Sequence, residues 1–305
     1  MDVSVILVNY NTRKMTSECI DTIYAQTKDV SFEVILIDND SQDGSQEFFA
    51  QDKRVRFVES GGNIGFGRAN NLGLKYATGK YIFFLNTDTL LLNNAVKLFF
   101  DYAESHNNER IGALGTILLD ANRMPTFSCG HFLTIKIIFQ VLTVHFGHVP
   151  DIYGANIPKE KLELNAFDVD YVSGANIFVS KDIIDRYGAF DPEFFMYYEE
   201  NEMQHRWKVA GYASRIINGP KIIHLEGGSF KKNNKKGAVS RRAYSVKTLI
   251  NRKSEMIYFK KCYSKAYYLL YRLCFFLYIL NDILKRMDLK FIKDEFKLAC
   301  KGDYK

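Results

Sequence analysis

Several polar segments in the first ninety residues follow directly on apolar runs. Asn86-Thr87-Asp88 comes after Tyr81–Leu85, so an amide and a carboxylate would stand at the end of a buried strand. Similar points recur after three other apolar runs, at Asn9-Tyr10-Asn11, Asp38-Asn39-Asp40-Ser41 and Asn63–Gly67. Because α/β proteins bind ligands at the carboxyl ends of their strands, we expect four strand ends to meet at one crevice.

Each of these segments also has a purely structural interpretation. Asn, Thr and Asp favour turns and helix caps after strands, so Asp88 could be only a turn residue. In the same way, Asp43 or Ser45 could simply cap the next helix. Carboxylates and hydroxyls at a strand end are, however, also the groups that bind a base or a ribose. The recurrence at several strand ends favours the functional interpretation.

The glycine-rich segment Gly61–Asn71 superficially resembles a dinucleotide-binding fingerprint. Its glycines do not have the GxGxxG spacing, and the first turn, Asn9–Thr12, contains no glycine. A glycine-rich turn that leads into a helix can still bind phosphate through its backbone N–H groups. The segment could therefore bind phosphate without being a Rossmann site.

Two later segments carry further candidate side chains. Glu199-Glu200 follows the aromatic run Phe194–Tyr198, and it could be either an ordinary acidic first helical turn or a general base in a partly dry pocket. His224 follows a strand-like run; although a lone histidine is more often structural, it could bind a divalent ion together with a carboxylate.

The order of the elements predicts an α/β fold with a mostly parallel sheet, because strand and helix patterns alternate. We expect residues 1–95 to form one half of the domain and residues 96–230 the other. The predicted strands are 3–9, 32–38, 55–59, 81–86, 111–119 and 169–179. The predicted helices are 14–26, 43–51, 66–77, 93–105, 179–187 and 199–209. Residues 122–165 have no clear pattern.

Positive charge is concentrated in residues 231–305, which contain 20 Lys and Arg against 6 Asp and Glu. We expect a basic loop at 231–242, then helices, and an anionic partner such as a membrane surface rather than nucleic acid. The apolar run 266–280 is shorter than the ~20 residues that a membrane-spanning helix needs, so it would lie on a membrane. The alternative is a solvated charged surface with a core-packing aromatic helix.

Cysteine usage and the first residues indicate the compartment. The five cysteines have neither a disulfide pattern nor zinc-site spacing, and the chain starts with a strand pattern rather than a secretory signal. We therefore expect a cytoplasmic protein at the inner face of the cell membrane.

In combination, the ordered motifs resemble the inverting family 2 glycosyltransferases, which have a GT-A fold and use nucleotide-sugar donors. The resemblance covers about residues 3–230, and its LNxDT and GNxGFGxANN motifs are similar to the rhamnosyltransferase-like branch. The matching segments are 3–11, 37–45, 63–73, 84–89, 173–175, 188–200 and His224.

The resemblance implies a role for each matched residue. It implies that the nucleotide base is bound by Val8, Tyr10 and Asp38. The ribose and diphosphate would be bound by Asn63, Asn70, Asn86 and Asp88, and the acceptor by Gly174, Ala175 and Glu199. The resemblance also assigns Mg²⁺ or Mn²⁺ to Asp88 and His224, and the general base to Glu200. An exposed glutamate has a pKa of about 4.3, so Glu200 would be ionised.

The sequence departs from the family pattern at three positions. Asn86 replaces the first acid of the usual DxD, Glu200 stands where Asp is usual, and Asn70 stands where Arg is frequent. One carboxylate fewer weakens the expected metal binding.

The predicted activity is transfer of a sugar, with dTDP-L-rhamnose as the leading donor, to a hydroxyl of a surface polysaccharide or lipid-linked glycan. A UDP-hexose or UDP-N-acetylhexosamine donor is the alternative. A nucleotidyltransferase would need a glycine-rich basic loop that residues 9–13 do not supply. A non-enzymatic adaptor on a decayed transferase fold is a further alternative.

Overall fold

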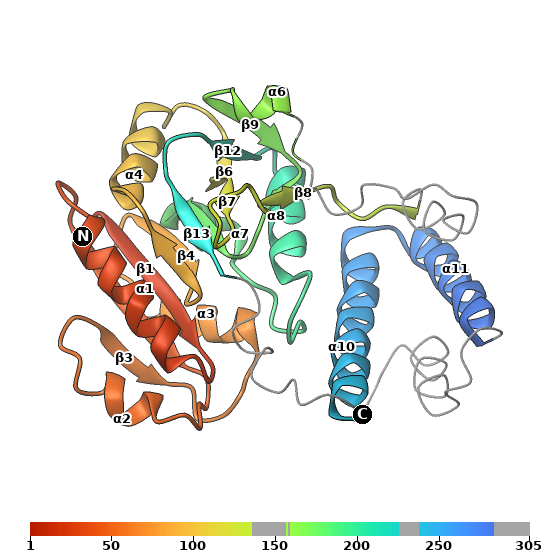
Figure 1. Ribbon diagram of the computed structural model, residues 1–305. Coiled ribbons are helices and arrows are strands. Elements are labelled where there is room, and N and C mark those ends of the chain that lie inside the picture. The colour runs from red at the N-terminus through yellow and green to blue at the C-terminus, as the bar shows by residue number, and fades with distance from the viewer. Residues whose placement is uncertain (136–156, 158, 226–237, 284–305) are drawn as a thin grey trace.

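The computed structural model describes residues 1–135, 157, 159–225 and 238–283 (Figure 1). Its centre is an eight-stranded sheet in the order β3-β2-β1-β4-β11-β6-β12-β9. Strands β1, β2, β3 and β4 are parallel to one another, whereas β11 runs antiparallel to β4. The strands of this sheet are β1 (Val3–Asn9), β2 (Phe32–Asp38), β3 (Arg56–Glu59), β4 (Tyr81–Asn86), β6 (Ile111–Gly115), β9 (Ala166–Val169), β11 (Asn176–Ser180) and β12 (Ala213–Ile217).

The central strands β1, β2 and β4 are mostly apolar and buried, as expected where helices cover both faces of a sheet. Val3, Val5 and Leu7 of β1 point into one core cluster, and Ile6 points into the other. Among the described residues up to 210, the helices are α1 (Arg13–Gln26), α2 (Ser45–Phe49), α3 (Phe66–Leu74), α4 (Ala95–Ser105), α6 (Lys159–Leu162), α7 (Lys181–Tyr187) and α8 (Glu199–Val209). This architecture confirms the predicted α/β class with a mostly parallel sheet.

Two small sheets lie beside the central one. One pairs β8 (Cys129–Gly130) with β10 (Tyr171–Val172), and the other has the order β5-β13-β7. In the second, β13 (Ile222–His224) lies between β5 (Thr89–Leu91) and β7 (Leu118–Leu119). Strand β13 thereby brings His224 next to the residues that follow β4.

Three predictions of single elements in the second half were wrong. The predicted strand 111–119 is split between β6 and β7, which belong to different sheets. Thr116 interrupts it, because its hydroxyl donates hydrogen bonds to the carbonyls of Ile217 and Pro220. The predicted strand 169–179 is likewise divided between β10 and β11, and the helix predicted from 179 begins only at Lys181.

The C-terminal part contains α10 (Ala238–Cys262) and α11 (Lys265–Ile283). The predicted loop 231–242 was wrong at residues 238–242, which are helical, and residues 231–237 lie outside the described part of the chain. Helix α10 packs against α8 and α11, on the side of α8 away from β1 (Figure 1). Among the residues described, no helix is long and apolar enough to cross a membrane.

The turn before α3 contacts the segment that leads into α8 at very short range. The Phe66 amide donates a hydrogen bond of 3.0 Å to the Phe195 carbonyl. A Cβ at Gly65 would lie 2.3 Å from that carbonyl oxygen, and Gly65 also has φ +87°. Only glycine therefore permits this approach.

We expect Gly65→Ala to destabilise the protein by about 3 kcal/mol, because it combines a left-handed backbone penalty with a steric clash. Gly61→Ala is the matched control, since Gly61 has φ +75° but no atom within 4 Å of its added Cβ. It should cost only about 1 kcal/mol. Urea denaturation measures both, and equal losses would show that the Phe195 contact contributes nothing.

Candidate active site

The carboxyl ends of the first four parallel strands lie side by side, as predicted. Asn9 at the end of β1 is in register with Asp38 at the end of β2, and Asp38 is in register with Glu59 at the end of β3. On the other side of β1, Val8 pairs with Asn86 at the end of β4. The polar segments that follow these strands therefore share one edge of the sheet.

Asp88 and His224 meet at this edge. His224 Nε2 lies 3.2 Å from Asp88 Oδ1, and each side chain is only 15% exposed. Two backbone contacts fix the pair: β13 is in register with β5 at His224 and Thr89, and the Leu225 amide donates to the Asp88 carbonyl at 2.9 Å. The two predicted metal ligands are thus neighbours, although 136 positions separate them in the sequence.

The spacing of this pair fits two ligands of one divalent ion. Adjacent ligands of an octahedral ion with bonds of about 2.1 Å lie about 3 Å apart. Buried polar atoms also remain unused here: within the described residues, neither His224 Nδ1 nor Asn86 Oδ1 has a hydrogen-bond partner. The same residues contain no cluster of three or more His, Cys, Asp or Glu that could hold a metal. An ion would therefore need phosphate oxygens or water as further ligands.

Glu200 lies near the same strand end, at the first turn of α8. A Cβ at Gly174 would be 3.7 Å from the Cβ, Cγ and Cδ atoms of Glu200. The next residue, Ala175, accepts a hydrogen bond of 3.0 Å from the Asn86 amide. Glu200 and the residues that follow β4 are therefore joined through a short series of contacts, so Asp88 and Glu200 belong to one region of the molecule.

The two adjacent carboxyl groups have unusual proton affinities. Glu199 is buried, and among the described residues its Oε2 has no hydrogen-bond partner. Burial and the charge of Glu200 raise the pKa of Glu199 well above its usual value. Burial also raises the pKa of the half-buried Glu200 to about 7. Glu200 therefore does not have the pKa of an exposed glutamate, and its burial agrees with the alternative of a carboxylate in a partly dry pocket.

Asp38 occupies a different environment from the one expected for a base-contacting residue. It has no exposed surface, and its Oδ2 accepts a hydrogen bond of 2.7 Å from Asn9 Nδ2. Its Oδ1 accepts from the Ser41 amide at 2.9 Å and from Gln46 Nε2 at 3.2 Å. In this conformation the carboxylate organises the loops after β1 and β2, and the exposed aromatic side chain at this edge is Tyr10.

Three consecutive amides of the glycine-rich turn bind groups of the protein in this conformation. Ile64 donates to Asn39 Oδ1, Gly65 to Asn63 Oδ1 and Phe66 to the Phe195 carbonyl. This part of the turn supports the segment before α8, and binding of phosphate by the turn stays a prediction.

The asparagines of this motif differ in accessibility. Asn70 is buried, and its amide donates to the Phe66 carbonyl at 3.1 Å, so it stabilises the start of α3. Asn63 is exposed at the sheet edge. Of the two, only Asn63 is open to a ligand in this conformation.

Sequence reasoning missed the residues that hold the segment before α8. Tyr197 and Tyr198 both have left-handed backbone conformations, with φ 72° and 65°. The Met196 carbonyl accepts a hydrogen bond of 2.6 Å from Ser254 of α10, 58 residues later in the chain. No local pattern could have indicated this contact, because serine in a helix is common and carries no spacing signal.

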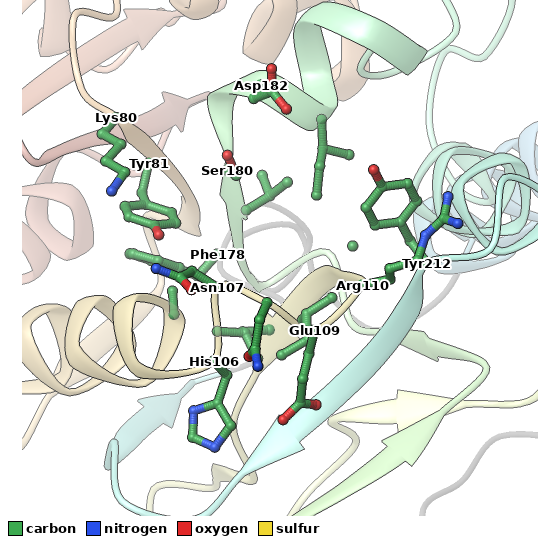
Figure 2. Close-up of a pocket in the computed structure, with 17 residues that line it drawn as sticks. Lys80, Tyr81, His106, Asn107, Glu109, Arg110, Phe178, Ser180, Asp182 and Tyr212 are labelled. Atoms are coloured by element: carbon green, nitrogen blue, oxygen red, sulfur yellow. The ribbon is translucent and has the colours of Figure 1, made fainter.

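A cavity of about 330 Å³ lies at the opposite edge of the sheet, near the start of β4 and β6. Figure 2 shows Lys80, Tyr81, Asn107, Arg110 and Tyr212 around it. It contains none of the predicted site residues.

The chain is similar to known glycosyltransferases in sequence and in fold. Residues 4–118 match the model of glycosyl transferase family 2. The chain is 26% identical over 211 residues to the low-salt glycan biosynthesis hexosyltransferase Agl10 of Haloferax volcanii, covering 67% of this chain and 61% of that protein. It is 33% identical over 106 residues to the glycosyltransferase GlyG of Streptococcus pneumoniae, covering 33% of this chain and 35% of that protein. The chain thus spans less than two thirds of either relative.

A third relative is the N-acetylglucosaminyl-diphospho-decaprenol L-rhamnosyltransferase of Mycobacterium tuberculosis, which is 25% identical over 216 residues and covers 64% of this chain and 67% of that protein.

Two solved structures have the same fold. The mannosyltransferase PcManGT of Pyrobaculum calidifontis, in complex with GDP-Man and Mn²⁺, superposes with a TM-score of 0.52 at 17% identity and covers 85% of this chain and 63% of that chain. Staphylococcus aureus TarS superposes with a TM-score of 0.57 at 14% identity and covers 98% of this chain and 48% of that chain. At this identity the structures show the fold alone, which is GT-A. Residues 4–118 of the chain are therefore similar to the glycosyl transferase family 2 domain.

Proposed function

We propose that the protein is an inverting glycosyltransferase that moves a sugar from a nucleotide donor to a hydroxyl of a glycan or lipid-linked acceptor. One observation carries this proposal: the Asp88–His224 pair and Glu200 lie at the same sheet edge, linked through Asn86, Ala175 and Gly174. Residues 1–95 would bind the donor, and residues 96–230 would bind the acceptor.

Glu200 would act as the general base. Its carboxylate takes the proton of the acceptor hydroxyl while that oxygen forms a bond to the anomeric carbon. The bond from this carbon to the diphosphate oxygen breaks on the opposite face, so the electron pair leaves with the nucleotide diphosphate and the configuration inverts. Glu199, Gly174 and Ala175 would lie on the side from which the acceptor approaches, with Glu199 and Ala175 buried in the present conformation.

The donor side of the proposed site contains Val8, Tyr10, Asn63 and Asn86. Asp38 would act indirectly, through its hydrogen bonds to Asn9 and Ser41. The L-rhamnosyltransferase among the relatives and the LNTDT sequence favour dTDP-L-rhamnose as donor. A UDP-hexose or UDP-N-acetylhexosamine is the alternative.

We expect Glu200→Gln to lower the rate of transfer by about 10²–10⁴-fold, because the amide cannot accept the proton. Below the raised pKa of Glu200 the carboxyl is protonated and inactive, so the wild-type rate should rise with pH, reach half of its plateau near pH 7 and level off above that. Release of nucleotide diphosphate with donor and acceptor measures both. Glu163→Gln, at an exposed position after α6, should keep the full rate. An unchanged rate in Glu200→Gln would rule out the base and favour the adaptor alternative.

Asp88 and His224 would hold Mg²⁺ or Mn²⁺, which supplies positive charge for the leaving diphosphate. We expect Asp88→Asn and His224→Ala each to weaken Mn²⁺ binding by at least about tenfold in the presence of nucleotide diphosphate. His131→Ala is a matched control, because His131 Nδ1 also lies 3.2 Å from a carboxylate, that of Asp170, but outside the proposed site. Calorimetric titration that gave equal effects for all three would refute the assignment.

Peripheral association with the inner face of the cell membrane is also proposed. Helix α11 exposes four leucines by 45–55%, and residues 231–305 are strongly basic; the leucines are Leu269, Leu270, Leu273 and Leu277. Replacing Leu273 and Leu277 by Ser should reduce flotation with anionic vesicles, whereas Val209→Ser, at an exposed apolar position of α8, should not. Equal flotation of all variants would remove this part of the proposal.

A further inference from the structure

The segment Phe194–Tyr198, which leads into the two acids of α8, is held from two sides. On one side the Phe195 carbonyl accepts the Phe66 amide at 3.0 Å. On the other side the Met196 carbonyl accepts the Ser254 hydroxyl of α10 at 2.6 Å. Ser254 is only 2% exposed, so water does not compete for this hydrogen bond.

The two residues between this anchor and Glu199 are conformationally strained. Tyr197 and Tyr198 adopt left-handed backbone angles consecutively, which non-glycine residues rarely do. Such a conformation persists only where surrounding contacts enforce it. The anchored carbonyl of Met196 is immediately before this turn, and Glu199 is immediately after it.

Side chains of α10 make further contacts with the same segment. Tyr258 lies 5.7 Å from Tyr198 between ring centroids, and Phe194 is fully buried in one cluster with Met256 and Tyr258. Lys261 pairs with Asp191 at 2.8 Å and with Glu193 at 2.9 Å. The contacts of α10 therefore extend from Asp191 to Tyr198, which includes the loop just before this segment.

We propose that Ser254 is a positioning residue: through the Met196 carbonyl, α10 holds the Tyr197–Tyr198 turn, and thereby keeps Glu200 aimed at the proposed acceptor site and shielded from water. The role in transfer rests on the proposed function, whereas the effect on the Glu200 carboxyl does not. The C-terminal helices would then be part of the catalytic unit and not only a membrane-facing appendage.

Ser254→Ala removes the hydroxyl that anchors the turn. Tyr263→Phe is a matched control, because it also removes one hydroxyl that donates to a backbone carbonyl, that of Leu133, at 2.7 Å. Calorimetry should give similar losses of stability for the two variants, since each loses one hydrogen bond. Ser254→Thr keeps a hydroxyl and should restore the behaviour of the wild type.

Titration of the Glu200 carboxyl by ¹³C NMR is the first readout. The other titratable or charged groups of the turn and of α10 beside it include Glu199, Tyr197, Tyr198, Tyr258, Glu255, Arg252, Lys261 and Lys247, whose ammonium lies 5.8 Å from the Tyr197 ring centroid. These groups are the same in all three variants. We expect the Glu200 midpoint to fall by at least one pH unit in Ser254→Ala, toward that of an exposed glutamate, and to stay at the wild-type value in Tyr263→Phe.

Transfer kinetics are the second readout. Ser254→Ala should lower kcat about tenfold with an unchanged KM for the donor, and Tyr263→Phe should change neither. A wild-type Glu200 midpoint in Ser254→Ala, or equal shifts in both variants, would overturn the proposal. A shifted midpoint in a protein that transfers no sugar would instead contradict the proposed function and leave the positioning role intact.

Discussion

The geometry of the candidate site depends on the contact between the turn before α3 and the segment before α8. The Phe195 carbonyl sits against Gly65 and accepts the Phe66 amide, so a loop that follows β11 in the chain is fixed on a helix that follows β3. Asn71 of the same helix adds two hydrogen bonds to the backbone of Phe190. This contact sets the position of the segment before α8, while two hydrogen bonds between Gln204 and the backbone of Val172 hold α8 itself against β10.

The burial of the Glu199 and Glu200 carboxyl groups lowers the stability of the fold and raises their proton affinity. Two carboxyl groups begin one helix, and one of them is buried without a full set of partners. The helix dipole offsets part of that cost, but burial still raises both pKa values. A carboxylate with a raised pKa is a stronger base than an exposed one, so the strained turn and the desolvation serve the same purpose under the proposed mechanism.

The sequence predicted those parts of the molecule that local patterns encode. The apolar runs of β1, β2 and β4 ended where predicted, and their polar ends met because parallel strands share one edge. Asp88 and His224 were brought together as the family resemblance implied. The environment of Asp38 could not be predicted, because its burial depends on Asn9, Ser41 and Gln46 closing around it.

Local sequence patterns likewise could not predict the contacts between segments that are distant in the chain. The hydrogen bond from Ser254 to Met196 joins a helix in the basic C-terminal region to the loop of the candidate base. Hydrophobic periodicity predicts that a helix forms but not which surface it packs on. The same limit explains why Glu200 was expected to have the pKa of an exposed glutamate.

The most direct test is a crystal structure with Mn²⁺ and a nucleotide diphosphate bound. The account predicts an anomalous peak for Mn²⁺ in contact with Asp88 and His224, the diphosphate beside it, and the Glu200 carboxyl facing the open side of the same site. A nucleotide bound at the opposite edge, in the cavity near Lys80 and Arg110, or a Glu200 side chain directed away from the ion, would contradict it.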